Sequence, residues 1–167
     1  LSNMPVNCTL GLELPIHPAY LYPNRFRRNQ KGLVALQDQQ RYRRLVENQL
    51  KAAGFEEPPV SVEAVAAHLG VPIRVLTLPL WFTAALIYED GMPAILLNDS
   101  RPAAVRRAGL GHLLGHILIV METPGAHYPR ESESQHEAAD FVAAELETPE
   151  FMVRDQAQKW FNDYRYL

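Results

Sequence analysis

Two histidines four residues apart, His112 and His116, are the residues best suited to carry chemistry in this sequence. On a helix this spacing places both imidazoles on one face, a single turn apart. Both rings can then bind one zinc ion at about 2.0–2.1 Å, and a third protein ligand completes a site that keeps one position open for water. A carboxylate on the next helix is the natural third ligand, and Glu137 stands there. We therefore predict a Zn²⁺ site at His112, His116 and Glu137, against the plainer interpretation of two unrelated core or solvated histidines.

The composition limits which other chemistries are available. The chain has 167 residues, 47% hydrophobic and 21% charged, which fits one globular domain with a sizeable core. Its single cysteine, Cys8, excludes an internal disulfide framework and a cysteine-based zinc finger, whereas six histidines and many carboxylates remain as metal ligands. No membrane-spanning or export segment is predicted. Together with the single thiol, this predicts a cytoplasmic protein.

The elements that must position these residues follow from periodicity and turn residues. Residues 1–36 are predicted to be an irregular arm rich in proline, aromatic residues and arginine, and residues 37–167 a single domain. Apolar spacing and caps predict helices and strands in the order α-α-β-β-β-α-α-α, with a strand pair turning at Asp90-Gly91. The expected fold class is α+β, with a small antiparallel sheet of about three strands packed against helices. The expected helices cover 37–53, 62–69, 102–121, 133–147 and 149–161, and the expected strands cover 71–78, 82–88 and 94–98.

Three glycines lie inside the helix that carries the histidine pair: Gly109, Gly111 and Gly115. Glycine within a helix costs about 0.5–1 kcal/mol relative to alanine. Such a repeated cost predicts that another element packs very close to this helix.

The residues around the histidines resemble a known family. The segment 106–118 is similar to the active helix of the ImmA/IrrE metallopeptidases (the DUF955 domain), in which a basic residue and a short apolar stretch precede a His-Glu-Leu-Gly-His motif. The segment 137–146, followed by Pro149, resembles that family's Glu-Ala-x-x-Phe-Ala segment. Further segments upstream follow the family's order, so the resemblance covers about residues 37–152. It implies a zincin-like active helix, zinc ligands at His112, His116 and Glu137, and cleavage of a regulatory protein, typically a transcriptional repressor.

One departure from the family motif concerns the catalytic base. The family's glutamate after the first histidine is Leu113 here. In a zinc peptidase that carboxylate takes a proton from the metal-bound water and passes it to the leaving amine, and leucine does neither. General acid–base catalysis contributes about 10²–10⁴ in rate. We therefore expect a catalytically degenerate pseudopeptidase, which binds metal and a protein partner and captures an extended segment at the edge of its sheet.

An active endopeptidase is the alternative, if another residue replaces the missing base. Glu133 lies four residues before Glu137 on the same helical face and could be a substitute base, a replacement ligand or a hydrogen-bonding partner of a ligand. His127 lies on the loop between the two helices. His136 points about 100° away from Glu137 around the helix, so it is expected to be less suitable.

A second alternative belongs to another class of protein. Basic residues are concentrated between Arg25 and Arg44, whereas acidic residues are concentrated between Glu131 and Asp163, although the formal net charge is only −3. The basic cluster could contact nucleic acid as part of a non-enzymatic regulator. We favour the interpretation that it is solvated or pairs with the acidic C-terminal helices of the same chain, so nucleic-acid binding is not expected.

Overall fold

The computed structural model describes residues 34–89, 91–122 and 133–164, and these form helices packed on one side of a small sheet. The α+β class and the order of the elements agree with the predictions from sequence. The helices are α1 (Leu36–Ala52), α2 (Val62–His68), α3 (Ala103–Glu122), α4 (Glu133–Glu147) and α5 (Glu150–Tyr164). The strands are β1 (Ile73–Leu76), β2 (Ala84–Glu89) and β3 (Met92–Asn98). The predicted arm lies almost wholly outside the described residues.

The sheet has the order β1-β3-β2, and it is mixed rather than antiparallel. β2 and β3 form the predicted antiparallel hairpin, with Leu86 opposite Ile95. β1, however, runs parallel to β3, with Ile73 opposite Ile95, so the prediction of a wholly antiparallel sheet is wrong. The chain reverses twice between β1 and β3, and the hairpin inserts β3 between the other two strands. The buried, apolar β3 takes the central position, which suits a strand covered on both faces.

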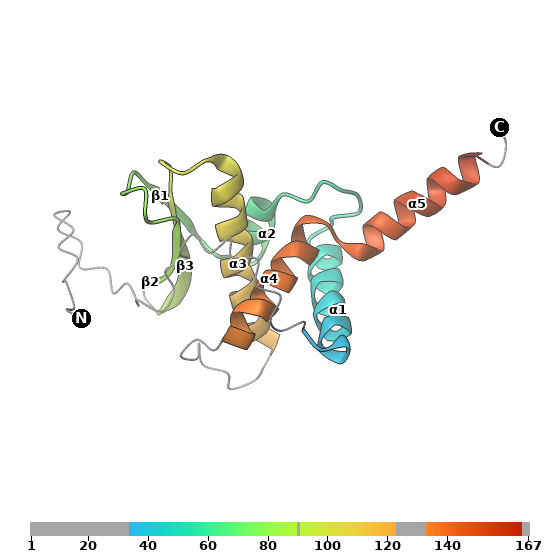
Figure 1. The fold of residues 1–167 in the computed structure, drawn as a ribbon, viewed down its shortest axis with the longest axis horizontal. Helices are drawn as coiled ribbons and strands as arrows, with labels where there is room; N and C mark the ends of the chain where they lie inside the picture. The colour runs from blue at the N-terminus through green and yellow to red at the C-terminus, as the bar shows by residue number, and fades with distance from the viewer. Residues whose placement is uncertain (1–33, 90, 123–132, 165–167) are drawn as a thin grey trace.

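Helix α3 forms the centre of the molecule. Figure 1 shows the sheet on one side of α3, with α4 and α1 on the other side and α5 leading away from the body. Every residue from Gly109 to Leu118 is buried, because neighbours surround this part of the helix. Its apolar side chains share one core with Val46 and Leu50 of α1 and with Leu86 and Ile95 of the sheet.

Ion pairs link α1 to α3 and to the two acidic helices that follow it. Arg43 Nε lies 3.0 Å from Glu145 Oε1 and 2.7 Å from Glu150 Oε2. Arg41 Nε lies 3.2 Å from Glu122 Oε2. The predicted pairing with the acidic C-terminal helices is thus confirmed for Arg43, whereas Arg41 pairs with the end of α3. The basic residues before residue 34 lie outside the described ranges. None of the helices in those ranges has the length and apolar character needed to cross a bilayer.

Candidate metal centre

The site lies where α3 and α4 come into very close contact. A Cβ atom placed on Gly115 would be 2.5 Å from the carbonyl oxygen of Ala139, a distance that real Cβ atoms do not adopt. A Cβ atom on Gly111 would lie 3.4 Å from the Cβ of Ala143, which is ordinary contact. The close packing predicted from the helix glycines is therefore confirmed. Because small residues face each other on both helices, side chains next to this contact can meet across it.

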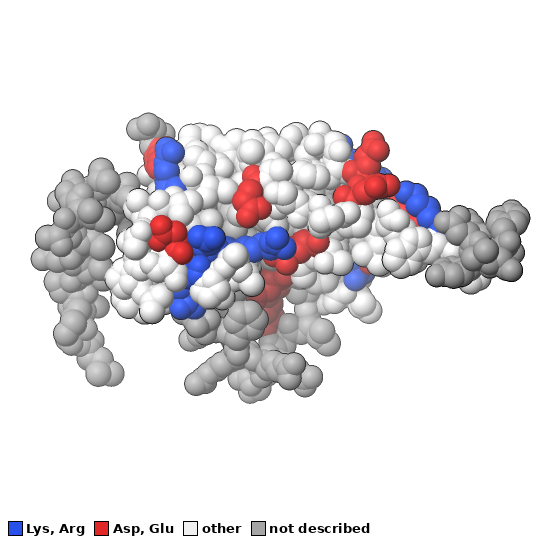
Figure 2. Space-filling model, turned by 90° about the horizontal axis from the view of Figure 1, so that it is seen from above, with Lys and Arg blue, Asp and Glu red and all other residues white. Residues whose placement is uncertain are grey.

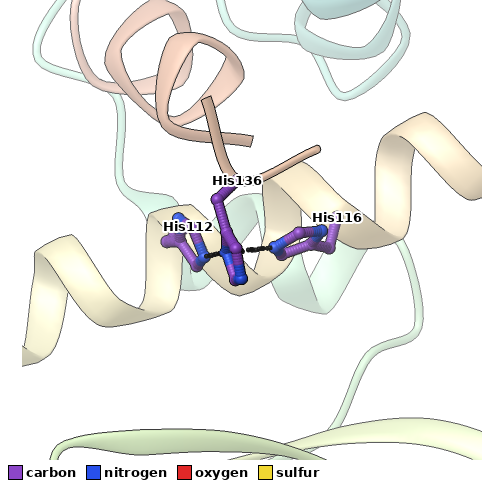
Figure 3. Close-up of side chains that lie close together, drawn as sticks. All are labelled: His112, His116 and His136. Carbon is purple, nitrogen blue, oxygen red and sulfur yellow. Dashed lines mark hydrogen bonds between the residues drawn. The ribbon is translucent and has the colours of Figure 1, made fainter. Parts of the chain in front are cut away.

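Three imidazoles converge at this contact, as Figure 3 shows. His112 and His116 come from successive turns of α3, and His136 reaches them from the first turns of α4. The Nε2 atoms of His112 and His116 lie 3.1 Å apart. The Nδ1 atom of His136 lies 3.1 Å from His112 Nε2 and 3.3 Å from His116 Nε2. His112 and His116 are buried and His136 is half-buried, so the group is largely shielded from water.

These separations suit a tetrahedral metal ion. Two nitrogens bound to one tetrahedral zinc ion are about 3.3 Å apart when each Zn–N distance is about 2.05 Å. The three nitrogens form a triangle of 3.1, 3.1 and 3.3 Å, so each lies about 1.8 Å from the centre of the triangle. An ion at bonding distance from all three would lie about 1 Å to one side of their plane. The three histidines thus fit a metal ion that keeps a fourth position open.

Asp140 forms a hydrogen bond with one of these rings, on the side that faces away from the other two. Its Oδ1 lies 2.7 Å from His112 Nδ1, the ring nitrogen that does not face the group. With the Nδ1 proton donated to this carboxylate, the lone pair of Nε2 points to the other two imidazoles. A carboxylate behind a metal-binding histidine fixes its tautomer and ring orientation and raises its basicity. Asp140 lies one turn after His136 on α4, so one face of α4 provides both a candidate ligand and this support.

Burial keeps His116 neutral. Burial is the largest cause, and together with the neighbouring His112 and His136 it lowers the pKa of this imidazole to about 3, against the opposing charge of Asp140. The neutral ring has a free lone pair, which is the form that binds metal ions.

The residue that replaces the family's catalytic glutamate belongs to the core. Leu113 is 1% exposed and packs in the main hydrophobic cluster with residues of α1 and of the sheet. The structure therefore uses position 113 for packing.

The structure brings together two of the three ligands predicted from sequence. Glu137 is half-buried on α4, and its carboxylate is not among the donor atoms that meet within 4.8 Å in the described part of the chain. Its role as a ligand stays a prediction. The side chain of Glu133 and the whole of His127 lie outside the described residues.

His136 is the residue that sequence reasoning missed. The expectation that it is less suitable than its neighbours on the helix is wrong, because the face of α4 that meets α3 is the face of His136. A signal for this face existed in the sequence. Ala139 and Ala143 follow His136 at helical spacing, and their small size matches Gly111 and Gly115 on α3.

Comparisons with known proteins add no assignment: no family model matches the chain, and no curated protein matches it. The resemblance to the ImmA/IrrE metallopeptidases thus depends on the sequence motifs alone.

Proposed function

We propose that this protein binds a divalent transition-metal ion, with zinc as the physiological ion, through His112, His116 and His136. The observation that supports this proposal is the triangle of three imidazole nitrogens with separations of 3.1 to 3.3 Å. An all-imidazole donor set suits zinc, copper, nickel and iron, whereas magnesium and calcium prefer oxygen ligands. Zinc also accepts a three-histidine site with an open fourth position.

We further propose that the domain is a metallopeptidase-like protein with little or no peptidase activity. A zinc ion, when bound, acts as a Lewis acid and makes a bound water more acidic. Efficient hydrolysis also requires a residue that moves protons, and position 113 supplies only a buried leucine. Asp140, the carboxylate seen at the site, is already hydrogen-bonded to His112. The residues described around the three histidines therefore bind and orient a metal ion, and position 113 lacks the proton-transfer group of a peptidase.

The resemblance to the ImmA/IrrE family favours a protein partner of the transcriptional-repressor type, met in the cytoplasm. An active endopeptidase that uses Glu133 as its base is the second candidate, because this residue starts the helix that carries His136. A nucleic-acid-linked regulator has less support, since Arg41 and Arg43 are paired with acids of the same chain.

The metal content of protein purified without chelators tests the proposal most directly. We expect about one equivalent of zinc by elemental analysis in the wild type, and a loss of most of it in His112→Ala and His136→Ala. Glu137→Ala is the matched control, since it removes the adjacent side chain of the same helix and is expected to keep the metal. Zinc below about a tenth of an equivalent in the wild type would refute the metal proposal. Loss of zinc in Glu137→Ala but not in His136→Ala would make Glu137 the third ligand.

The activity proposal has a separate test. Incubation of the zinc-loaded protein with repressor proteins of its host is expected to give no discrete cleavage product. A product that chelators abolish, and that forms more slowly with Glu133→Gln, would establish the active endopeptidase instead.

A further inference from the structure

A groove of about 450 Å³ lies beside β1, at the end of the molecule where α3 begins. Its apolar floor is formed by Ile73 and Val75 of β1 and by Leu97 of β3. Arg106 and Arg107 line it from α3, and Glu63 lines it from α2. The groove is separate from the metal centre, because none of its lining residues belongs to the three-histidine group.

The edge of β1 is available for pairing with another strand. Within the described part of the chain, β1 pairs on one side only, with β3. The carbonyl groups of Pro72 and Leu76 accept hydrogen bonds from the β3 side of the sheet. Because successive residues of a strand present their backbone groups to opposite edges, the N–H and C=O groups of Ile73 and Val75 point to the open edge. Val75 is 52% exposed, so nothing in the described ranges covers this edge.

The charge of the groove favours an acidic ligand. Arg107 is exposed, and within the described ranges the Nη1 of Arg106 makes a long contact of 3.5 Å to the carbonyl oxygen of Asp99. Glu63 is already held by a hydrogen bond of 3.1 Å from the hydroxyl of Ser61. Figure 2 faces this end of the molecule and shows basic side chains gathered near the middle, with acidic side chains on either side.

The segment after β1 carries exposed apolar side chains on a backbone that is held in place. Leu80 and Trp81 are 65% and 60% exposed. Their backbone is nevertheless held by the buried Asn98, whose side-chain amide donates to the carbonyls of Pro79 and Phe82 and whose oxygen accepts from the Leu78 N–H. Exposed aromatic and aliphatic side chains on a well-held backbone are typical of protein-binding surfaces. This feature favours a peptide over a small anion as the ligand.

We propose that the edge of β1 binds an extended acidic segment of another protein, which adds to the sheet as a fourth strand. Backbone groups of Ile73 and Val75 would pair with it, as in other cases of strand addition. Side chains two residues apart in a strand lie on the same face. One such side chain would fill the apolar floor and the other would meet Arg106 and Arg107, so the motif is an apolar residue and an Asp or Glu two positions apart.

The proposal rests on the proposed function only in the statement that the protein has a protein partner. It does not depend on a bound metal ion. It differs from a general affinity for anions because it specifies the spacing of the apolar and acidic residues.

Fluorescein-labelled peptides of about nine residues test this spacing by fluorescence anisotropy. The first is a threonine–valine peptide with leucine and glutamate two positions apart. A second has the same composition with leucine and glutamate adjacent, and a third has glutamine in place of glutamate. We expect the first to bind about tenfold more tightly than the others. Equal affinity for all three, or no binding of the first at millimolar protein, would overturn the proposal.

Variants of the protein test the two halves of the recognition. Val75→Pro removes an outward N–H without touching the bonds to β3, because proline is tolerated at a sheet edge. We expect it to weaken binding about fivefold, whereas Val75→Ala keeps the N–H and binds more tightly than Val75→Pro. Arg107→Gln should lower the affinity for the glutamate peptide about tenfold. Arg44→Gln, on α1, is the control and should leave this affinity unchanged. Unchanged affinity in both Val75→Pro and Arg107→Gln would refute the site.

Two measurements separate this proposal from others. Inorganic phosphate that displaces the peptide equally well from wild type and Val75→Pro, with no preference for peptide spacing, would reduce the site to an anion site only. Peptide binding that is unchanged in the His136→Ala variant, alongside a loss of zinc, would leave the peptide site standing independently of the metal centre. Normal zinc content in a wild-type protein that binds no peptide would instead support the metal centre and overturn the peptide site.

Discussion

Asp140 acts on the candidate metal centre through His112. The carboxylate is 62% exposed, yet its hydrogen bond of 2.7 Å fixes the tautomer of a ring that is almost completely buried. Removing the negative charge while keeping the shape should therefore weaken metal binding without unfolding the protein.

We predict that Asp140→Asn lowers the affinity for zinc about 10–100-fold, the usual effect of losing the carboxylate behind a histidine ligand. Competition with a chromogenic chelator measures the affinity. Asp155→Asn, at an exposed position of α5, is the control and should have no effect. An unchanged affinity in Asp140→Asn would mean that Asp140 does not orient a ligand.

Leu113 gives a second prediction at the scale of one residue. Because its side chain is 1% exposed, Leu113→Glu places a carboxylate in the core, and we expect a loss of several kcal/mol in the free energy of unfolding. Leu113→Met, of similar volume, should cost less than about 1.5 kcal/mol. Urea denaturation measures both. A folded Leu113→Glu protein that cleaves a repressor would instead show that only the missing base had prevented catalysis.

The contact between α3 and α4 allows a prediction at the scale of the elements. Replacing a helix glycine by alanine normally stabilises by about 1 kcal/mol. At Gly111 the new methyl group has room, so Gly111→Ala should be neutral or stabilising. At Gly115 the methyl group would meet the backbone of Ala139, which cannot rotate away as a side chain does.

We therefore expect Gly115→Ala to destabilise the protein by about 1–3 kcal/mol and to weaken zinc binding, because the two helices must separate. Thermal unfolding and zinc titration of the two variants, compared directly, check this. If Gly115→Ala were as stable as Gly111→Ala, the described approach of α4 would be wrong.

Periodicity predicted the existence and order of the helices, because local patterns and caps determine them. The Ser61 cap and the left-handed Gly70, for example, enclose α2 as expected. The rotation of α4 about its axis was harder to predict from the sequence, because it depends on which face of the helix packs against α3. His136 and Glu137 are neighbours in sequence but differ by about 100° in direction around the helix. A small error in the expected rotation of α4 therefore decides which of the two is expected to face the histidine pair. The parallel pairing of β1 was likewise a tertiary outcome, set by the insertion of β3 between its neighbours.

Across the whole molecule, opposite charges join the two ends of the described chain. Arg43 contacts Glu145 and Glu150, and its guanidinium lies 5.5 Å from the ring centre of Phe141. It thereby connects α1 to both C-terminal helices. Such partly exposed pairs are individually weak, but Arg43 combines two of them with a cation–π contact.

We predict that Arg43→Ala lowers the free energy of unfolding by about 1 kcal/mol, a fall in Tm of about 2–4 °C. Arg44→Ala removes the same charge at the next, exposed position and should change the Tm less. A loss of DNA affinity in both variants, with no change in Tm, would favour the nucleic-acid alternative.

The close contact at Gly115 also restricts how this protein can vary through evolution. Position 115 must stay glycine wherever α4 keeps its place, and the facing positions 139 and 143 must stay small. Each glycine immediately precedes a histidine, at Gly111-His112 and Gly115-His116, and His136 precedes Ala139 by three residues. Related sequences should therefore preserve the Gly-His pair at positions 115 and 116, followed by a histidine and two small residues on the next helix, whereas position 111 can also be alanine. Position 113 should be free to exchange among large apolar residues.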